Sequence, residues 1–141
     1  MSILAMLVPL TPEARAAARD AERIPIHRFP FRVGRESRLA VRHGMLQVAE
    51  RRKLDHPPNN DLYLLDTGNP LNVSREHFQI EEDGDGGFVL VDRGSACGTL
   101  VGDQAVGGED RGGRATLTPG NVIVVGTSAS PYIYKFLLAE A

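Results

Sequence analysis

The sequence contains one cluster of polar side chains whose chemistry suits the binding of an anion. Ser74, Arg75 and His77 stand within four residues, and Arg35 follows Gly34 at the end of the short strand candidate 31–33. An arginine guanidinium matches phosphate oxygens in bidentate fashion, and a serine hydroxyl adds a short neutral donor. Because a phosphorylated side chain carries about −1.5 to −2 charges and three strong acceptor oxygens, two arginines and a serine are a suitable complement to it.

The same residue types also allow a catalytic interpretation. Ser74, His77 and Asp92 are the residue types of a hydrolytic triad, and Cys97 could act as a nucleophile with His77 as its base. However, Ser74 and His77 lie closer together than in the known triad orders, and Cys97 lacks the flanking residues of cysteine proteases. Geometry decides the question, and a His77 ring that points into the domain would end the hydrolase alternative.

Other functional classes find little support in the sequence. The four histidines, at positions 27, 43, 56 and 77, have no histidine partner three or four residues away, so we expect no metal site. The segment 83–87 begins like a calcium loop but has Phe88 where that loop requires glycine. Neither a P-loop nor a dinucleotide fingerprint occurs, so we expect no cofactor. A net charge of −2 gives no electrostatic reason to expect binding to nucleic acid or to a membrane.

Short β-strands are the elements that must position these residues. Apolar runs rich in β-branched and aromatic residues are separated by turns that use many of the 15 glycines and nine prolines. The clearest case is a hairpin in which 78–81 and 88–91 flank the glycine-rich segment 83–87. Further strands are predicted within 1–10 and at 24–26, 31–33, 62–65, 99–101, 121–125 and 132–137. This spacing favours an all-β sandwich.

Two segments depart from the strand pattern. Thr11 as N-cap, Pro12 at the first helical position and the alanines that follow predict a helix within 11–22 that crosses one edge of the sandwich. The basic segment 36–59 begins directly after Arg35, and structureless loops of that length are uncommon. We therefore expect an insertion that is partly helical or mobile, with two helical turns at 45–52, and that covers the Arg35 site or extends it.

Length and composition fit one globular domain spanning 1–141. The 141 residues are 42% hydrophobic and 24% charged, enough to bury a sizeable core. A single cysteine excludes an intrachain disulfide and fits a reducing compartment, so a cytoplasmic location is expected. The apolar start lacks the Lys or Arg that precedes a signal-peptide core, which favours a buried first strand instead.

Five blocks, in order along the chain, resemble the forkhead-associated (FHA) domain, a phosphothreonine-peptide-binding β-sandwich. The blocks are FRVGR (31–35), NDLYL (60–64), VSREH (73–77), DRGSACGT (92–99) and LTPGNVIVVG (117–126), within a core of about 24–138. The resemblance implies about eleven strands in two sheets, with the recognition loops gathered at one end. It also implies a module without catalysis that binds a phosphothreonine-containing protein, the substrate of a Ser/Thr kinase.

The resemblance assigns residues to the phosphopeptide-binding site. Arg35 would hold the phosphate, Ser74 would donate to a phosphate oxygen, and Arg75 would line the same site. Ala96 and Cys97 would belong to the loop that faces the peptide.

A second set of residues receives structural roles from the resemblance. Gly34 would set the turn that presents Arg35, and the His77 ring would hold its loop in shape. Asp92 would fix the following loop, and Gly98 with Thr99 would restart the next strand.

The sequence departs from the family pattern at two points. Cys97 stands where the family usually has an asparagine that grips the peptide backbone, and Gly102-Asp103 replaces the more frequent Asn-Gly. Loss of the amide contacts would weaken peptide binding by about 1–3 kcal/mol. Cys97 and the long insertion therefore motivate an alternative, a phosphorylation-independent scaffold with the same fold.

Overall fold

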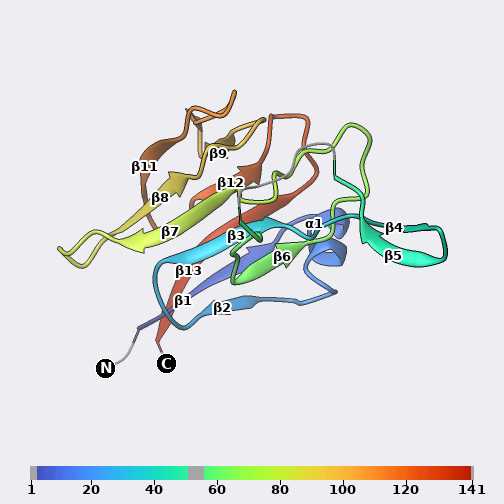
Figure 1. The fold of residues 1–141 in the computed structure, drawn as a ribbon. Coiled ribbons are helices and arrows are strands. Elements are labelled where there is room, and N and C mark those ends of the chain that lie inside the picture. Colours follow the sequence, from blue (N-terminus) through green and yellow to red (C-terminus); the bar gives the residue numbers. More distant parts are fainter. Residues whose placement is uncertain (1–2, 51–55, 141) are drawn as a thin grey trace.

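Two antiparallel-rich sheets form a β-sandwich in the computed structural model, which describes residues 3–50 and 56–140 (Figure 1). The six-stranded sheet contains, in spatial order, β10 (Gln104–Val106), β9 (Thr99–Val101), β12 (Val122–Val125), β13 (Ile133–Glu140), β1 (Ile3–Pro9) and β2 (Ile24–Ile26). The five-stranded sheet contains β11 (Gly113–Leu117), β8 (Phe88–Asp92), β7 (Phe78–Glu82), β3 (Phe31–Arg35) and β6 (Leu62–Leu64). The all-β sandwich is thus confirmed.

The core lies between the two sheets and follows the alternation of apolar residues along the strands. β12 alternates half-buried and buried positions, and β8 turns Leu90 inward. Each fully buried large apolar side chain contributes about 1.5–3 kcal/mol to folding. Core residues that are at most 1% exposed include Val33, Leu64, Phe78, Ile80, Leu90, Leu117, Ile123, Tyr134 and Phe136.

The strand directions bring the predicted site loops to one end of the sandwich. β3 and β6 run parallel, so both end at the same side, and the antiparallel β7 begins there. β8 is antiparallel to β7 and therefore ends at that side as well. Consequently the end of β3, the β6–β7 connection and the β8–β9 connection meet, as the FHA resemblance implies.

The predicted helix is present as α1 (Pro12–Ala17). Thr11 Oγ1 accepts a hydrogen bond of 3.0 Å from the Ala14 amide, and Pro12 occupies the first turn. Ala14 and Ala17 are buried, and the Tyr134 hydroxyl donates to the Ala14 carbonyl at 2.9 Å. Small side chains thus let this short helix lie close against the sandwich edge.

The prediction of two helical turns at 45–52 is wrong for the part of that segment that the structure describes. β4 (Leu39–Arg42) and β5 (Met45–Val48) form an antiparallel hairpin instead, and residues 51–55 lie outside the described residues. His43 and Gly44 both have positive φ, 54° and 73°, which is the signature of a type I′ hairpin turn. A tight turn between alternating apolar residues therefore overrides the weak helical propensity.

The strand count exceeds the expectation because of this hairpin. In the described residues the two sandwich sheets hold the eleven strands that the resemblance implies, and β4–β5 adds a separate two-stranded sheet. Strands β10 and β11 had no prediction from the sequence. Both are rich in small and polar residues, with β10 exposed at two of its three positions.

Candidate functional site

An open cavity of about 430 Å³ lies at the loop end of the sandwich. Its walls come from the end of β3, the insertion, the 71–76 loop and the 93–97 loop with Asp110. All five residues predicted to bind phosphopeptide line this cavity, namely Arg35, Ser74, Arg75, Ala96 and Cys97. The topology therefore brings together residues that are up to about sixty positions apart in the chain.

Gly34 allows the backbone of the 72–77 loop to approach β3 closely. A Cβ at Gly34 would overlap the carbonyl oxygen of Arg75. The Arg35 amide donates to the Ser74 carbonyl at 2.9 Å, which locks the loop to the strand end. The turn expected at Gly34 is not observed, because Gly34 is part of β3. This glycine is needed for close packing of two backbone segments.

His77 braces two loops against each other from inside the domain. Its ring is 0% exposed, its Nδ1 accepts from the Ser74 amide at 2.9 Å, and its Nε2 lies 2.7 Å from the Gly98 carbonyl. Since Nδ1 accepts, the proton resides on Nε2, which donates to Gly98. Burial lowers the pKa of His77, although the Gly98 hydrogen bond and the Asp92 charge act in the opposite direction.

The His77 geometry removes the base that the hydrolase alternative requires. Both ring nitrogens are occupied by backbone groups and the ring is fully buried, so neither Ser74 nor Cys97 receives a general base from it. Among the described residues there is no group of three or more His, Cys, Asp or Glu side chains arranged to hold a metal ion. In the same residues no helix is long and apolar enough to cross a membrane.

Asp92 and Ser95 fix the shape of the 92–99 loop. Asp92 Oδ1 accepts from the amides of Gly94 and Ser95 at 3.0 and 2.8 Å. Its Oδ2 accepts from the hydroxyls of Ser95 and Thr99 at 2.6 and 2.9 Å. The loop is therefore wound around one buried carboxylate, and Gly98 takes a φ of 81° that favours glycine before β9 begins at Thr99.

Asp66 fixes the shape of the 66–73 segment in the same way. This residue received no role from the sequence. Its Oδ2 accepts from the amides of Asn72 and Val73 at 2.7 and 2.9 Å, and its Oδ1 accepts from the Tyr132 hydroxyl at 2.9 Å. Burial and this carboxylate raise the pKa of Tyr132 to about 12. The local signal for Asp66 is the Asp-x-Gly sequence that follows a strand, since Asp66 Oδ1 also accepts from Gly68 in an Asx-turn.

Ser74 links the two loops on the cavity side. Its Oγ accepts from the Ala96 amide at 3.0 Å, and a hydroxyl that accepts in this way can still donate its own proton to a ligand. Cys97 follows directly, with Sγ at 3.8 Å from the Leu71 carbonyl. A thiol is a weak donor, so this wall of the cavity has little hydrogen-bonding strength at Cys97.

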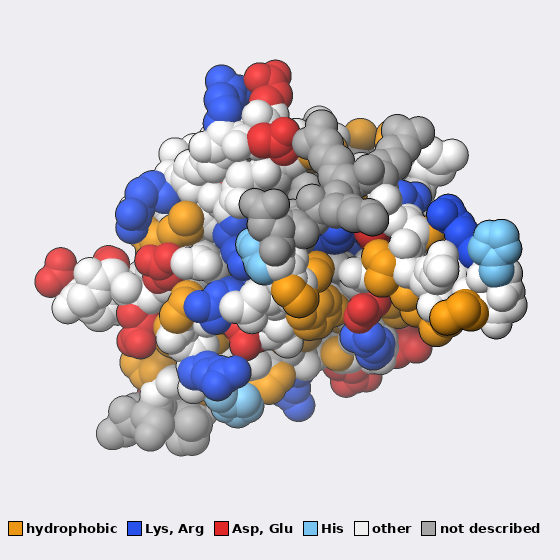
Figure 2. All heavy atoms as spheres, in the orientation of Figure 1, with side chains coloured by type: hydrophobic (Ala, Val, Ile, Leu, Met, Phe, Trp, Pro, Cys, Tyr) orange, Lys and Arg blue, Asp and Glu red, His pale blue; other side chains and the backbone are white. Residues whose placement is uncertain are grey.

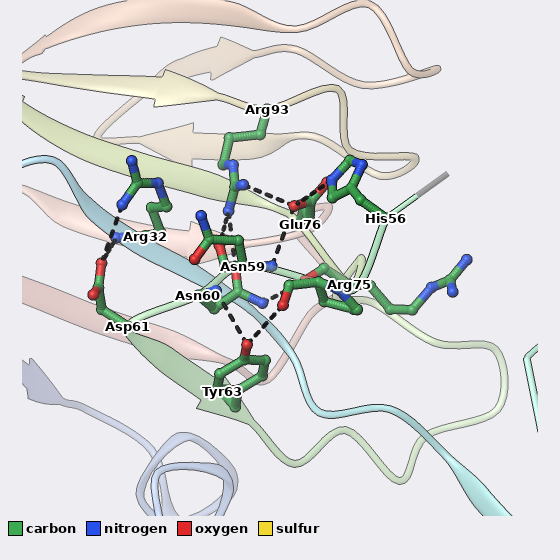
Figure 3. Close-up of polar contacts among 10 residues, drawn as sticks. Arg32, His56, Asn59, Asn60, Asp61, Tyr63, Arg75, Glu76 and Arg93 are labelled. Atoms are coloured by element: carbon green, nitrogen blue, oxygen red, sulfur yellow. Dashed lines mark hydrogen bonds and ion pairs between the residues drawn. The ribbon is translucent and has the colours of Figure 1, made fainter. Parts of the chain in front are cut away.

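A polar network beside the 72–77 loop holds the backbone of Arg75 (Figure 3). Asn60 Nδ2 donates to the Arg75 carbonyl at 2.6 Å, and Asn60 Oδ1 accepts from Arg93 at 2.9 Å. Arg93 also bonds Glu76 Oε2 at 2.9 Å, and His56 Nε2 lies 3.1 Å from the same carboxylate. Burial lowers the pKa of Arg93, although the negative charge of Glu76 acts in the opposite direction.

Arg35 points into a buried polar environment at the cavity floor. The residue is 4% exposed, and its Nε donates to the Val73 carbonyl at 3.0 Å. Its Nη1 donates to the Glu36 carbonyl at 3.1 Å and to Glu50 Oε1 at 2.7 Å, and its Nη2 donates to Glu50 Oε2 at 2.9 Å. Glu50 had no assignment from the sequence, because nothing local in the 36–59 segment indicates a tertiary partner for it.

Solved structures with the same fold come from several sources. The FHA domain of the CT664 protein from Chlamydia trachomatis aligns at 19% identity over 98% of both chains, with a TM-score of 0.58. The yeast Pml1 splicing factor aligns at 16% identity over 99% of this chain and 82% of the other, with a TM-score of 0.62. An engineered FHA with a Myc-pTBD peptide aligns at 20% identity over 100% of this chain and 94% of the other, with a TM-score of 0.55.

The search of curated proteins returned no match, so the family assignment depends on the family model. The model of the FHA domain matches residues 31–126, most of the chain and all five blocks identified in the sequence. With the two-sheet sandwich and its loop-end cavity, this match shows that the chain belongs to the FHA domain family of phosphopeptide-binding interaction modules.

Proposed function

We infer that this chain is a phosphothreonine-dependent protein-interaction module without catalytic activity of its own. Its partner would be a phosphothreonine-containing protein, the product of a Ser/Thr kinase. The observation that carries the proposal is that Arg35, Ser74 and Arg75 line one cavity whose loops are fixed by buried hydrogen bonds of Asp66, His77 and Asp92. Loops fixed in this way suit a phosphate ligand because little ordering of the loops remains to be done on binding. The single cysteine supports a reducing, cytoplasmic setting for this partner.

Titration of phosphothreonine and plain threonine peptide libraries tests the proposal. We expect the phosphothreonine library to bind more tightly, and Ser74→Ala to lower its affinity about tenfold by removing a hydrogen bond to a charged oxygen. Ser128→Ala, a change of the same type at an exposed site, should leave the affinity unchanged. Equal affinity for the two libraries would refute phosphothreonine dependence.

Cys97 offers a gain-of-affinity test of the same site. Cys97→Asn introduces the amide that most family members have, and peptide backbone contacts from that amide are worth about 1–3 kcal/mol. Phosphopeptide affinity should therefore rise on the order of five- to 150-fold in fluorescence anisotropy titrations. An unchanged affinity would mean that the bound peptide does not reach this wall of the cavity.

One observation favours the phosphorylation-independent scaffold as a second candidate. The residues Leu39, Val41, Leu46 and Val48 share one face of the β4–β5 hairpin by register and alternation, and all four are exposed. Unpartnered apolar side chains of this kind mark interaction surfaces. This candidate predicts partner capture that survives phosphatase treatment and Ser74→Ala but is lost when Val41 and Leu46 are both replaced by serine.

A further inference from the structure

The Glu50 carboxylate is bound by the arginines that line the cavity. It receives two parallel hydrogen bonds from the Arg35 guanidinium and a third, of 2.8 Å, from the Arg38 amide. The Nε atoms of Arg38 and Arg75 lie 3.9 and 4.0 Å from Glu50 Oε2. A bidentate guanidinium, a backbone N–H and further positive charge are the groups that bind a phosphate in proteins.

The carboxylate is held as an ion within the protein. The Glu50 side chain is 4% exposed. Burial opposes its ionisation, but hydrogen bonds from Arg35 and Arg38 together with the charges of Arg35 and Arg75 outweigh that effect, so the pKa of Glu50 is lowered. Glu50 is therefore a charged ligand of the arginine cluster at neutral pH.

Arg35 cannot serve a phosphate and Glu50 in the same way at once. Four of the five N–H groups of a guanidinium are accounted for by Val73, Glu36 and Glu50, and the two that face Glu50 form its bidentate edge. A phosphate that binds Arg35 through this edge must take the place of the carboxylate.

We propose that Glu50 is an internal competitor for the phosphate subsite and thereby a specificity-determining residue, which admits a phosphorylated side chain and excludes a carboxylate. This rests on the proposed function as a phosphopeptide-binding module. A peptide carboxylate offers Arg35 the same single charge and two oxygens as Glu50. Because Glu50 is part of the same chain, it competes at high effective concentration and a peptide carboxylate gains nothing by replacing it. A phosphate brings about twice the charge and a third oxygen, which the Ser74 hydroxyl can meet.

The insertion is built so that Glu50 can leave without disturbing the core. β4 and β5 contribute no buried residue, and the hairpin projects from the sandwich with its hydrophobic side chains exposed (Figures 1 and 2). Its end near the sandwich is tied by the Ala49 amide to the Arg38 carbonyl at 2.8 Å, which is a bond within the insertion itself. Displacement of Glu50 therefore costs its ion pair with Arg35 and the hydrogen bond from the Arg38 amide, but no apolar packing from the hairpin strands.

The test compares the wild-type chain with Glu50→Gln, which keeps the shape of the side chain and removes its charge. The probes are inorganic phosphate, a phosphothreonine peptide library and the same library with glutamate in place of phosphothreonine. We expect Glu50→Gln to bind phosphate and phosphopeptides on the order of tenfold more tightly, the factor that a charge-assisted competing bond gives. It should also bind the glutamate library, which the wild-type chain should not.

Two further variants keep the test decisive. Glu82→Gln makes the same charge change on an exposed position at the end of β7 and should leave all three affinities unchanged. Glu50→Asp retains the charge, but its side chain is one methylene shorter and reaches Arg35 less well, so it should raise phosphate affinity to a smaller extent. It provides the answer if Glu50→Gln does not fold, as judged by circular dichroism.

The outcomes separate the inference from the proposed function. Phosphate affinity that is equal to or lower than that of the wild-type chain in the folded Glu50 variants overturns the inference, even if phosphothreonine peptides still bind selectively. Conversely, a gain in phosphate affinity on Glu50→Gln, with no preference for phosphothreonine over threonine peptides, supports the competitor and refutes the proposed function.

Discussion

The two sides of the cavity are held by different means. The 66–77 and 92–99 loops are wound around buried polar side chains, Asp66, His77 and Asp92, which bond mostly to backbone amides and carbonyls. The insertion reaches the same cavity through Arg38 and Glu50, and its strands share no buried residue with the core. One side is therefore part of the folded core and the other is an attachment. Because of this difference, we expect substitutions in the insertion to alter ligand specificity without loss of the fold.

On the side that belongs to the folded core, Gly34→Ala should cause the largest loss of unfolding free energy. The added Cβ would overlap the Arg75 carbonyl, a backbone atom that cannot move without displacing the 72–77 loop. We expect a loss of about 3–5 kcal/mol of unfolding free energy, the range of severe steric changes, in urea denaturation. Gly84→Ala is the control, since no atom lies near its Cβ and only its φ of 89° opposes alanine, at about 1 kcal/mol. Similar losses in both variants would contradict the close approach.

His77→Ala should have the next largest effect. The change leaves the Ser74 amide and the Gly98 carbonyl buried without their partner and opens a cavity, so we expect a loss of about 2–4 kcal/mol. Phosphopeptide affinity should fall as well, because Ser74 and the 92–99 loop lose their common brace. His27→Ala, at an exposed position, should change neither quantity by more than about 0.5 kcal/mol. A stable His77→Ala variant would mean that the Asp66 and Asp92 bonds alone define the loops.

The two sides should also respond to acid in different pH ranges. The pKa of His77 lies below its ordinary 6.5, so its contribution to stability is complete above pH 6.5 and is lost as pH falls through the folded-state value. The pKa of Glu50 lies below 4.5, so its contribution is complete above pH 4.5 and is lost at lower pH. Unfolding free energies measured from pH 8 to pH 3 should therefore fall in two stages.

Glu50→Gln isolates the lower stage of this acid response. The variant should lose part of the decline below pH 4.5 and keep the decline that begins below pH 6.5, because it removes one titrating group and leaves His77 in place. Parallel curves for the two chains throughout the acid range would show that Glu50 contributes no pH-dependent stability, contrary to its pairing with Arg35.

The same contrast explains what the sequence could predict. The strands follow from alternation and turn residues, and the His77 brace follows from the family resemblance to the VSREH block. Glu50 could not be predicted, because its partner Arg35 is fifteen residues away and their contact depends on how the β4–β5 hairpin folds back. The hairpin itself was missed because its sequence suits a short helix nearly as well, and a His-Gly turn with two positive φ values decides the outcome.

The smallest expected effect belongs to the exposed face of the insertion. Val41 is 72% exposed, so Val41→Ser removes little buried surface and should change the unfolding free energy by less than about 0.5 kcal/mol. Val33→Ser is the matched change in β3, where the side chain is 1% exposed, and it should cost about 2–4 kcal/mol because a hydroxyl and a void replace packed methyl groups. If Val41→Ser instead costs more than about 1 kcal/mol, the apolar face of β4–β5 is buried in solution against another surface. The insertion would then be a structural part of an assembly, and Glu50 would be less free to leave Arg35 than its exposed hairpin indicates.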